Sequence, residues 1–301
     1  MDQPRPRNFR RLEPGQRSEL RIGDIGGAEH VVVWESSEKL FEAPNWTPDG
    51  RWLVFNQEGD LYRVAPERGS RPEKIAIEGD FPANNDHVLS PDGSTLYISV
   101  SDGHIYAVPF AGGAPRRVSN VHQERFTYYL HGVSPDNATL AYVAVQRDQN
   151  DRVLPINTYT IPSRGGPDTR LTDWRWNDDG PEYSPDGAWI YFNSVYGSDT
   201  PGHSQVCRMR PDGSEVTRIT NDERVNWFPH PSPNGEHILY LSFPPGTEGH
   251  PANKEIALRL MHPDGREQRD LAWFNGGQGT TNVNGWAPDS QRFAYVAYPV
   301  G

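Results

Sequence analysis

Thr47-Pro48-Asp49-Gly50 is the first of six copies of one turn motif, and this motif decides the fold. The prolines of successive copies are 43 to 55 residues apart, close to the ~40–50 residues of a four-stranded propeller blade. Proline presets φ, Asp or Asn bonds its own backbone, and Gly or Asn accepts positive φ, so each copy predicts a tight reversal between two strands. The later copies are Ser90-Pro91-Asp92-Gly93, Ser134-Pro135-Asp136-Asn137, Ser184-Pro185-Asp186-Gly187, Ser232-Pro233-Asn234-Gly235 and Ala287-Pro288-Asp289-Ser290.

Short apolar or alternating runs come after every turn, as is typical of strands. Residues 52–55 form such a run in the first unit. In most units a second strand, a Gly-rich turn and a short fourth strand come next, as in residues 104–108, 111–113 and 116–118. The sequence therefore predicts an all-β fold, a six-bladed β-propeller of four-stranded antiparallel blades.

The two ends of the chain complement each other. The sixth unit stops at Tyr298 after two strands, whereas residues 19–34 contain a strand, a Gly26-Gly27 turn and another strand. We predict that this N-terminal segment completes the last blade and closes the ring, which removes exposed sheet edges. The predicted organisation is a flexible tail over residues 1–18 and a single propeller over residues 19–301.

Composition limits the classes of partner and the compartment. A formal net charge of −11 argues against a nucleic-acid or anionic-membrane partner, since both need a concentrated basic surface. The single cysteine, Cys207, excludes an internal disulfide framework. The chain shows no signal-peptide h-region and no stretch of membrane-spanning length. We expect a cytoplasmic protein, or a periplasmic one if a leader was removed, without a membrane partner.

The order of strand, Ser-Pro-Asp-Gly turn, strand, Ile-Tyr strand, Asp-Gly or Gly-Gly turn and Leu-Thr strand resembles the PD40 repeat, a WD40-like repeat of TolB-type β-propellers. It is also similar to the propellers of prolyl-oligopeptidase relatives. The resemblance covers residues 19–298, and residues 226–230, 249–254 and 276–280 resemble a bacterial TolB-like group of unknown function. With neither the extra N-terminal domain of TolB nor a Gly-x-Ser-x-Gly elbow in the sequence, we expect neither a Tol–Pal envelope role nor peptidase chemistry.

Blade geometry predicts where a ligand site lies. Residues five to eight positions before each turn proline approach one mouth of the central channel, and long loops at residues 146–157, 196–205 and 243–254 open on the same face. Amide, carboxylate and aromatic groups there suit a small polar ligand, polyhydroxylated or peptide-like. Equally, such polar residues can line a water-filled channel or serve as turn residues. The candidates are Asn84, Asn85, Asp86, Tyr128, Tyr129, Asp178, Asp179, Glu182, Asn226, Trp227, Thr281 and Asn282.

Three histidines raise the question of a divalent metal in the central channel. His87 and His131 stand four residues before their turn prolines, and His230 stands three before its own. Imidazoles meeting across the channel suit a metal, with oxygens from Gln278, Glu182 or Asp86 completing the shell. The offset of His230 opposes this unless a bulge intervenes, because a one-residue shift reverses side-chain direction. Each histidine is otherwise a hydrogen-bonded structural residue, and His203 and His250 are expected to be solvated or lid residues.

Two functions remain after these observations. The first is a binding protein that recognises a carbohydrate, peptide or protein segment at the channel mouth. The alternative is a divalent-metal-assisted lyase or hydrolase of a sugar-derived substrate, with a channel His or Glu as base. Oligogalacturonate lyases, similar propellers that use His and Gln around a metal, are the precedent for the alternative. No complete catalytic motif is present, and we predict the binding protein.

Overall fold

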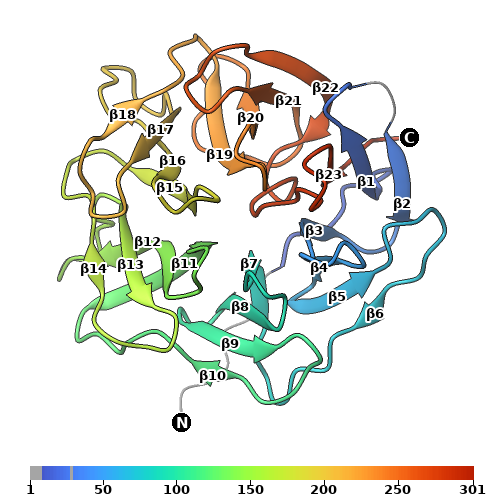
Figure 1. The fold of residues 1–301 in the computed structure, drawn as a ribbon, viewed down its shortest axis with the longest axis horizontal. Coiled ribbons are helices and arrows are strands. Elements are labelled where there is room, and N and C mark those ends of the chain that lie inside the picture. The colour runs from blue at the N-terminus through green and yellow to red at the C-terminus, as the bar shows by residue number, and fades with distance from the viewer. Residues whose placement is uncertain (1–8, 28–29) are drawn as a thin grey trace.

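The computed structural model describes residues 9–27 and 30–301, which form a ring of six blades around a central channel (Figure 1). All named strands pair in antiparallel fashion, and the described ranges contain no α-helix. Across this part of the chain, no helix is long and apolar enough to span a membrane. The predicted all-β, six-bladed propeller is confirmed.

Five blades each contain four consecutive strands, numbered from the channel outwards. They are β3 (Phe41–Trp46), β4 (Leu53–Gln57), β5 (Asp60–Val64) and β6 (Glu73–Lys74) in blade 1; β7 (Ala83–Leu89), β8 (Thr95–Val100), β9 (Ile105–Pro109) and β10 (Arg116–Arg117) in blade 2; β11 (Arg125–Val133), β12 (Thr139–Arg147), β13 (Asn157–Pro162) and β14 (Thr169–Arg170) in blade 3; β15 (Asp178–Tyr183), β16 (Ile190–Ser194), β17 (Gln205–Met209) and β18 (Thr217–Arg218) in blade 4; and β19 (Val225–Pro231), β20 (Ile238–Phe243), β21 (Lys254–Met261) and β22 (Arg269–Gly276) in blade 5.

Blade 6 joins the two ends of the chain. Strand β1 (Ser18–Asp24) pairs with β23 (Arg292–Ala297) on one side and with β2 (Val31–Ser36) on the other, as Figure 1 shows where blue meets red. Leu20 lies opposite Val296 in this ladder. The prediction that the N-terminal segment closes the ring is therefore confirmed.

The innermost position of blade 6 is irregular. Residues 280–287 make one bridge to β23, Trp286↔Phe293, in place of a regular strand. Gly285 lies so close to β23 that a Cβ there would overlap the Ala294 carbonyl oxygen. A side chain at position 285 would therefore push the segment away from the blade.

The repeated turns owe their shape to side-chain hydrogen bonds. In blade 2, the hydroxyl of Ser90 donates to Oδ1 of Asp92 at 2.6 Å and accepts the backbone N–H of Thr95 at 3.0 Å. Hydrogen bonds from Ser90 and Ser94 lower the pKa of Asp92 to about 2. The same Ser-to-Asp bond recurs between Ser134 and Asp136, so the turn carboxylates are structural.

A hydroxyl at the end of the fourth strand links neighbouring blades. The hydroxyls of Thr172 and Thr220 accept the N–H groups of Thr158 and Val206 in their own blades, both at 2.9 Å. Thr172 also donates to Asp178 of the next blade at 2.6 Å, and Thr220 accepts from Asn226 of its next blade at 3.1 Å. The Leu171-Thr172 and Ile219-Thr220 pairs thus fix blades 3 and 4 to the following inner strands.

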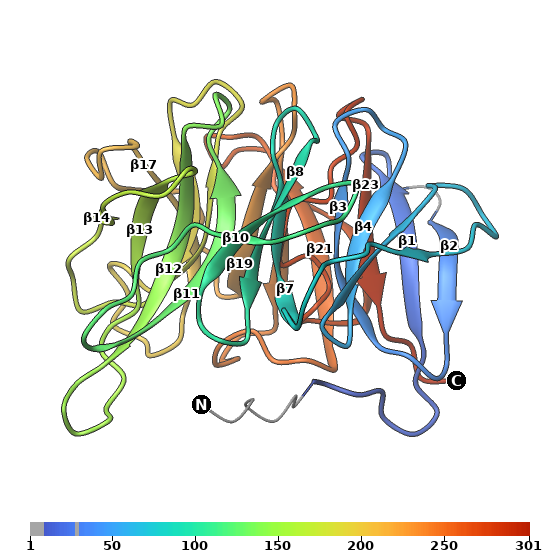
Figure 2. The same cartoon turned by 90° about the horizontal axis from the view of Figure 1, so that it is seen from below.

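Residues 1–8 of the predicted tail lie outside the described residues, so tail flexibility stays a prediction. Residues 9–17 run beneath the face from which the long loops after β12 and β20 project (Figure 2). There Gln16 donates to Oδ1 of Asn253 at 2.8 Å and to the carbonyl of Tyr298 at 3.2 Å. This segment therefore contacts the loops around one channel mouth.

Ring closure should dominate the stability of the closing blade. Leu20 is fully buried between blades, whereas Val31 on the outer strand β2 is 37% exposed. We expect Leu20→Ala to lower the free energy of unfolding by about 3 kcal/mol through the cavity it leaves, and Val31→Ala by less than about 1 kcal/mol. Urea denaturation of both variants measures this. Equal losses would contradict a closing role for β1.

Candidate functional site

The inner strands carry bulges that redirect their side chains toward the channel. Register shifts occur in β3, β7, β11, β15 and β19. In three of them a residue of positive φ precedes a proline: Ala43, Gly180 and Phe228. Because a bulge adds a residue and so reverses the direction of the side chains after it, the offset of His230 does not remove it from the channel. His131 and His230 both contact the irregular segment of blade 6.

Asp179 lies between two imidazoles on the long-loop side of the channel. Its Oδ1 is 2.9 Å from Nε2 of His131, and its Oδ2 is 3.6 Å from Nε2 of His250. Nδ1 of His131 is 3.2 Å from the Asn282 carbonyl oxygen. Burial by itself would lower the pKa of His131, but the charges of Asp86 and Asp179 raise it to about 9. His131 is therefore an imidazolium at neutral pH.

The two carboxylates of this cluster have different electrostatic surroundings. Burial raises the pKa of Asp86 to about 6, against the opposing charge of His131. Burial also acts to raise the pKa of Asp179, but its hydrogen bond from His131 holds that pKa below the usual value. Asn84 donates to Oδ2 of Asp86 at 2.7 Å. The cluster thus contains one firmly ionised carboxylate and one that titrates near neutrality.

His250 comes from the long loop after β20 and is half-buried, with 26% of its side chain exposed. Burial lowers its pKa. Its ring centroid lies 4.5 Å from that of Trp227 and 5.0 Å from that of Phe228. Nδ1 of His250 is buried and has no hydrogen-bond partner within the described residues. Of the two expectations for His250, a solvated or a lid residue, its contacts at the channel mouth favour the lid residue.

These groups surround a cavity of about 220 Å³ at the long-loop mouth of the channel. Blades 2 to 6 or their loops each contribute to its wall. Most of the lining residues are polar, and Val143, Val145 and Ile156 of blade 3 with Phe228 add a large apolar surface. The lining residues are Asn84, Asn85, Asp86, Tyr129, His131, Val143, Val145, Ile156, Asp179, Phe228, His250, Gln278 and Asn282.

A second pair of a histidine and a carboxylate lies deeper in the channel, toward the turns. Nδ1 of His230 is 2.7 Å from Oε2 of Glu182, and Nε2 of His230 is 2.6 Å from the Thr281 carbonyl oxygen. Asn284 donates to the other oxygen of Glu182. Glu182 and His131 also line a cavity of about 360 Å³ that opens between the turn prolines.

The metal hypothesis finds little support in these contacts. Both ring nitrogens of His131 and both of His230 are already engaged by carboxylates and backbone carbonyls. A metal ion needs an imidazole lone pair, so it would have to displace one of these partners. In residues 9–27 and 30–301, no group of three or more His, Cys, Asp or Glu side chains is arranged to hold a metal.

Tyr128 and Asn226 do not reach the cavity, in contrast to their predicted place. The Tyr128 hydroxyl contacts Nε2 of His122 at 2.7 Å and donates to Asp168 at 3.1 Å, away from the channel. Asn226 is fully buried between blades and donates to Thr220 and Gln205. Both stand seven residues before a turn proline, and this position faces the neighbouring blade. The residue one place later, Tyr129 in blade 3, lines the cavity instead.

His87 is also separate from the other histidines. Its side chain is fully buried, and burial lowers its pKa to about 4. Among described residues, neither ring nitrogen has a hydrogen-bond partner. His131 is itself the extra residue of the bulge in β11, whereas His87 pairs with Ile98 after the irregular part of β7. The same sequence spacing therefore gives the two histidines different directions.

The remaining predicted residues are brought together. Asn84, Asp86, His131, Gln278 and Asn282 line the cavity, and Trp227 packs on His250 beside it. Glu182 and His230 form the deeper pair. Asp179, a mouth candidate, proves central because it shares with Tyr129 the position six residues before the turn proline. This position, six residues before the turn proline, is the sequence signal that identifies Asp179 as a channel residue.

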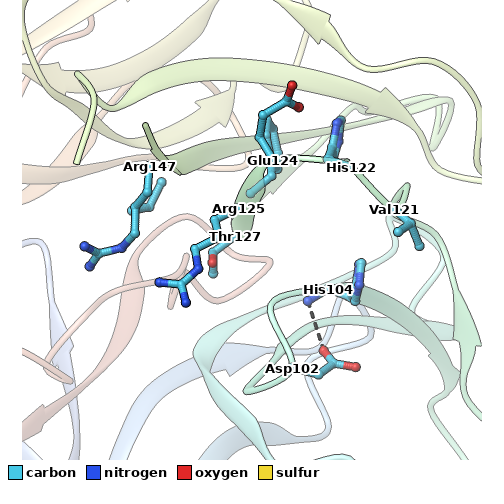
Figure 3. A pocket seen from close by; sticks show the side chains of 10 residues that line it. Asp102, His104, Val121, His122, Glu124, Arg125, Thr127 and Arg147 are labelled. Carbon is cyan, nitrogen blue, oxygen red and sulfur yellow. Dashed lines mark hydrogen bonds between the residues drawn. The ribbon is translucent and has the colours of Figure 1, made fainter. Parts of the chain in front are cut away.

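A larger hollow, of about 510 Å³, lies on the loop side between blades 2 and 3 (Figure 3). Arg125 and Arg147 flank it on one side, and His104 and His122 on the other. It shares Val145 with the channel-mouth cavity. Arg125 forms an exposed ion pair with Asp151 at 2.5 Å at the edge of this hollow.

Comparison with known proteins agrees with this architecture. Residues 133–250 match the model of the TolB beta propeller domain. An uncharacterised protein of Agrobacterium fabrum is 41% identical, over 94% of this chain and 92% of its own length. The chain belongs to the TolB-like β-propeller family. A solved TolB-type structure from Agrobacterium tumefaciens matches this TolB-like propeller with a TM-score of 0.85 at 40% identity, over 94% of this chain and 99% of that one.

The likeness extends more weakly to TolB itself. The Tol-Pal system protein TolB of Francisella tularensis is 24% identical over 91% of this chain. That match covers 60% of the Francisella protein, so the TolB-like propeller spans less than two thirds of its length.

The His131–Asp179 pair predicts a pH dependence of stability. Unfolded histidine titrates near pH 6.5, while His131 titrates near 9 when folded, so its contribution is complete below pH 6.5 and is lost as the pH rises toward 9. Between pH 7 and 8.5 the free energy of unfolding should fall by roughly 2 kcal/mol. Urea denaturation should show a flatter profile for His131→Gln. Identical slopes in both proteins would contradict the pairing.

Proposed function

We propose that this TolB-like propeller is a binding module that takes one small polar unit into the channel-mouth cavity. The unit is the end of a carbohydrate, a peptide or a protein segment. The observation that supports this most directly is the convergence of polar and apolar side chains from blades 2 to 6 on one cavity. The packing of a single blade does not require side chains from five blades to meet at one place.

The chemistry of the cavity wall favours a ligand rich in hydrogen-bond donors. Carboxylates of Asp86 and Asp179 accept hydrogen bonds, and the amides of Gln278 and Asn282 both donate and accept. The unpartnered Nδ1 of His250 leaves one further polar position to be satisfied. Phe228 gives an apolar surface for ring or chain carbons.

The size of the cavity restricts the ligand. About 220 Å³ is smaller than the ~300–1,000 Å³ of sites for drug-sized molecules. One sugar or amino-acid unit is therefore the appropriate occupant, with the rest of a longer ligand on the long-loop face. A protein or peptide partner is consistent with relatives named as components of the Tol-Pal system.

The metal-assisted lyase or hydrolase is the weaker proposal. Its general base would be Glu182 or a channel histidine, yet Glu182 is held by His230 and Asn284. Catalysis would require these internal bonds to break before a substrate proton is reached. A binding role requires no such rearrangement.

Substitution of Asp179 tests the binding role. In calorimetric titrations with a panel of monosaccharides, amino sugars and dipeptides, Asp179→Asn should weaken the best ligand at least tenfold, equivalent to about 1.4 kcal/mol. The matched control is Tyr128→Phe, which changes a hydroxyl outside the cavity and should leave affinity unchanged. Chelation should also have no effect. Equal losses in both variants would contradict the site, and loss on chelation would favour the metal-assisted alternative.

A further inference from the structure

Arg10 enters a cradle at the long-loop mouth, just outside the cavity. Its guanidinium carbon is 4.1 Å from the centroid of the Tyr298 ring, and its NH1 is 3.5 Å from Oε1 of Glu42. NH1 also donates to the carbonyl oxygen of Gln278. An aromatic face, a carboxylate and a carbonyl are the groups that together recognise a guanidinium. Arg10 thus occupies a site with the chemistry of an arginine pocket.

The fit of Arg10 to this cradle is incomplete. Its Nε and NH2 atoms are buried and, within the described residues, have no hydrogen-bond partner, and Oε1 of Glu42 accepts no hydrogen bond there either. A guanidinium has five N–H donors, and each buried donor left unpaired costs stability. The Arg10 contact is therefore weaker than the groups around it allow, and a better-oriented guanidinium can replace it.

The cradle is built by contacts that do not involve Arg10. The Tyr298 hydroxyl donates to the carbonyl of Phe41 at 3.0 Å, and the backbone N–H of Ala43 donates to the carbonyl of Gly279 at 2.7 Å. Gly279 has φ +85°, and a Cβ there would lie 2.5 Å from both Glu42 and the Tyr298 hydroxyl. Glycine at this position keeps the space open, so the cradle should persist when Arg10 leaves.

The charge of the surrounding mouth favours a cation. The carboxylates of Glu42, Asp86 and Asp179 lie here, and the charge of Glu42 contributes to the raised pKa of Asp86. Asp179 is compensated by His131, which leaves Arg10 as the cation that faces Glu42. Removing Arg10 makes the charge balance of the mouth more negative, and this attracts a basic ligand.

We propose that the cradle of Glu42, Tyr298 and the Gln278 carbonyl binds the arginine side chain of a peptide ligand, and that Arg10 is its intramolecular occupant. The ligand arginine displaces Arg10 and lifts residues 9–17 from the mouth. This goes beyond the proposed function, because the cradle lies beside the cavity and has its own chemistry.

Two matched comparisons test the proposal. The probe is N-acetyl-arginine methylamide, and its uncharged isostere is the citrulline analogue. By calorimetry, Arg10→Ala should bind the arginine probe at least tenfold more tightly than the wild type, because the internal competitor is gone. Arg11→Ala, which removes an exposed arginine next to it, should behave as the wild type. The citrulline probe should bind none of the three proteins.

Two double variants distinguish binding in the cradle from binding in the cavity. Arg10→Ala/Glu42→Gln should lose the gain, whereas Arg10→Ala/Asp179→Asn should keep it even if the cavity binds nothing. Equal affinity of Arg10→Ala and the wild type, or equal binding of the citrulline probe, would overturn the proposal. These two outcomes are decisive even where Glu42→Gln does not fold.

Discussion

The pairing of β1 with β23 is the interaction on which the other features depend. It joins the two ends of the chain, so that each blade packs between two neighbours. A channel whose wall comes from several blades keeps its dimensions only in a closed ring. The cavity at the long-loop mouth is therefore a product of closure as much as of its own residues.

Within the closed ring, side chains at successive positions of the inner strands face different surroundings. The position seven before the turn proline contacts the neighbouring blade, as in Asp178 and Asn226, whose partners Thr172 and Thr220 follow the fourth strands of the preceding blades. The next position faces the channel, as Asp179 and Tyr129 show. Strand alternation explains this division, and the bulges farther along each strand set the direction of the deeper pair, Glu182 and His230.

The fold could be predicted because its signals are local and repeated: turn chemistry fixes the reversals, and the spacing of prolines fixes the number of blades. Much of the site could be predicted from the same register, including Asp86, His131 and Asn282. Tyr128 and Asn226 were misplaced by one strand position, since the position seven before the proline faces the neighbouring blade. The other errors arose where geometry is not periodic. His87 and His131 have identical spacing but different places relative to a bulge. His250 lies in a loop whose path no repeat defines, so the sequence could not decide between a solvated and a lid residue.

The irregular inner edge of blade 6 has a consequence for how this family can diversify. Because residues 281 and 282 leave the strand ladder, their backbone carbonyls are available to accept from His230 and His131. A carbonyl is present whatever the side chain, so the orientation of both imidazoles tolerates sequence change in this segment. Mutational drift can then alter the side chains that face the ligand while the two histidines keep their places, and new specificities can arise on an unchanged frame.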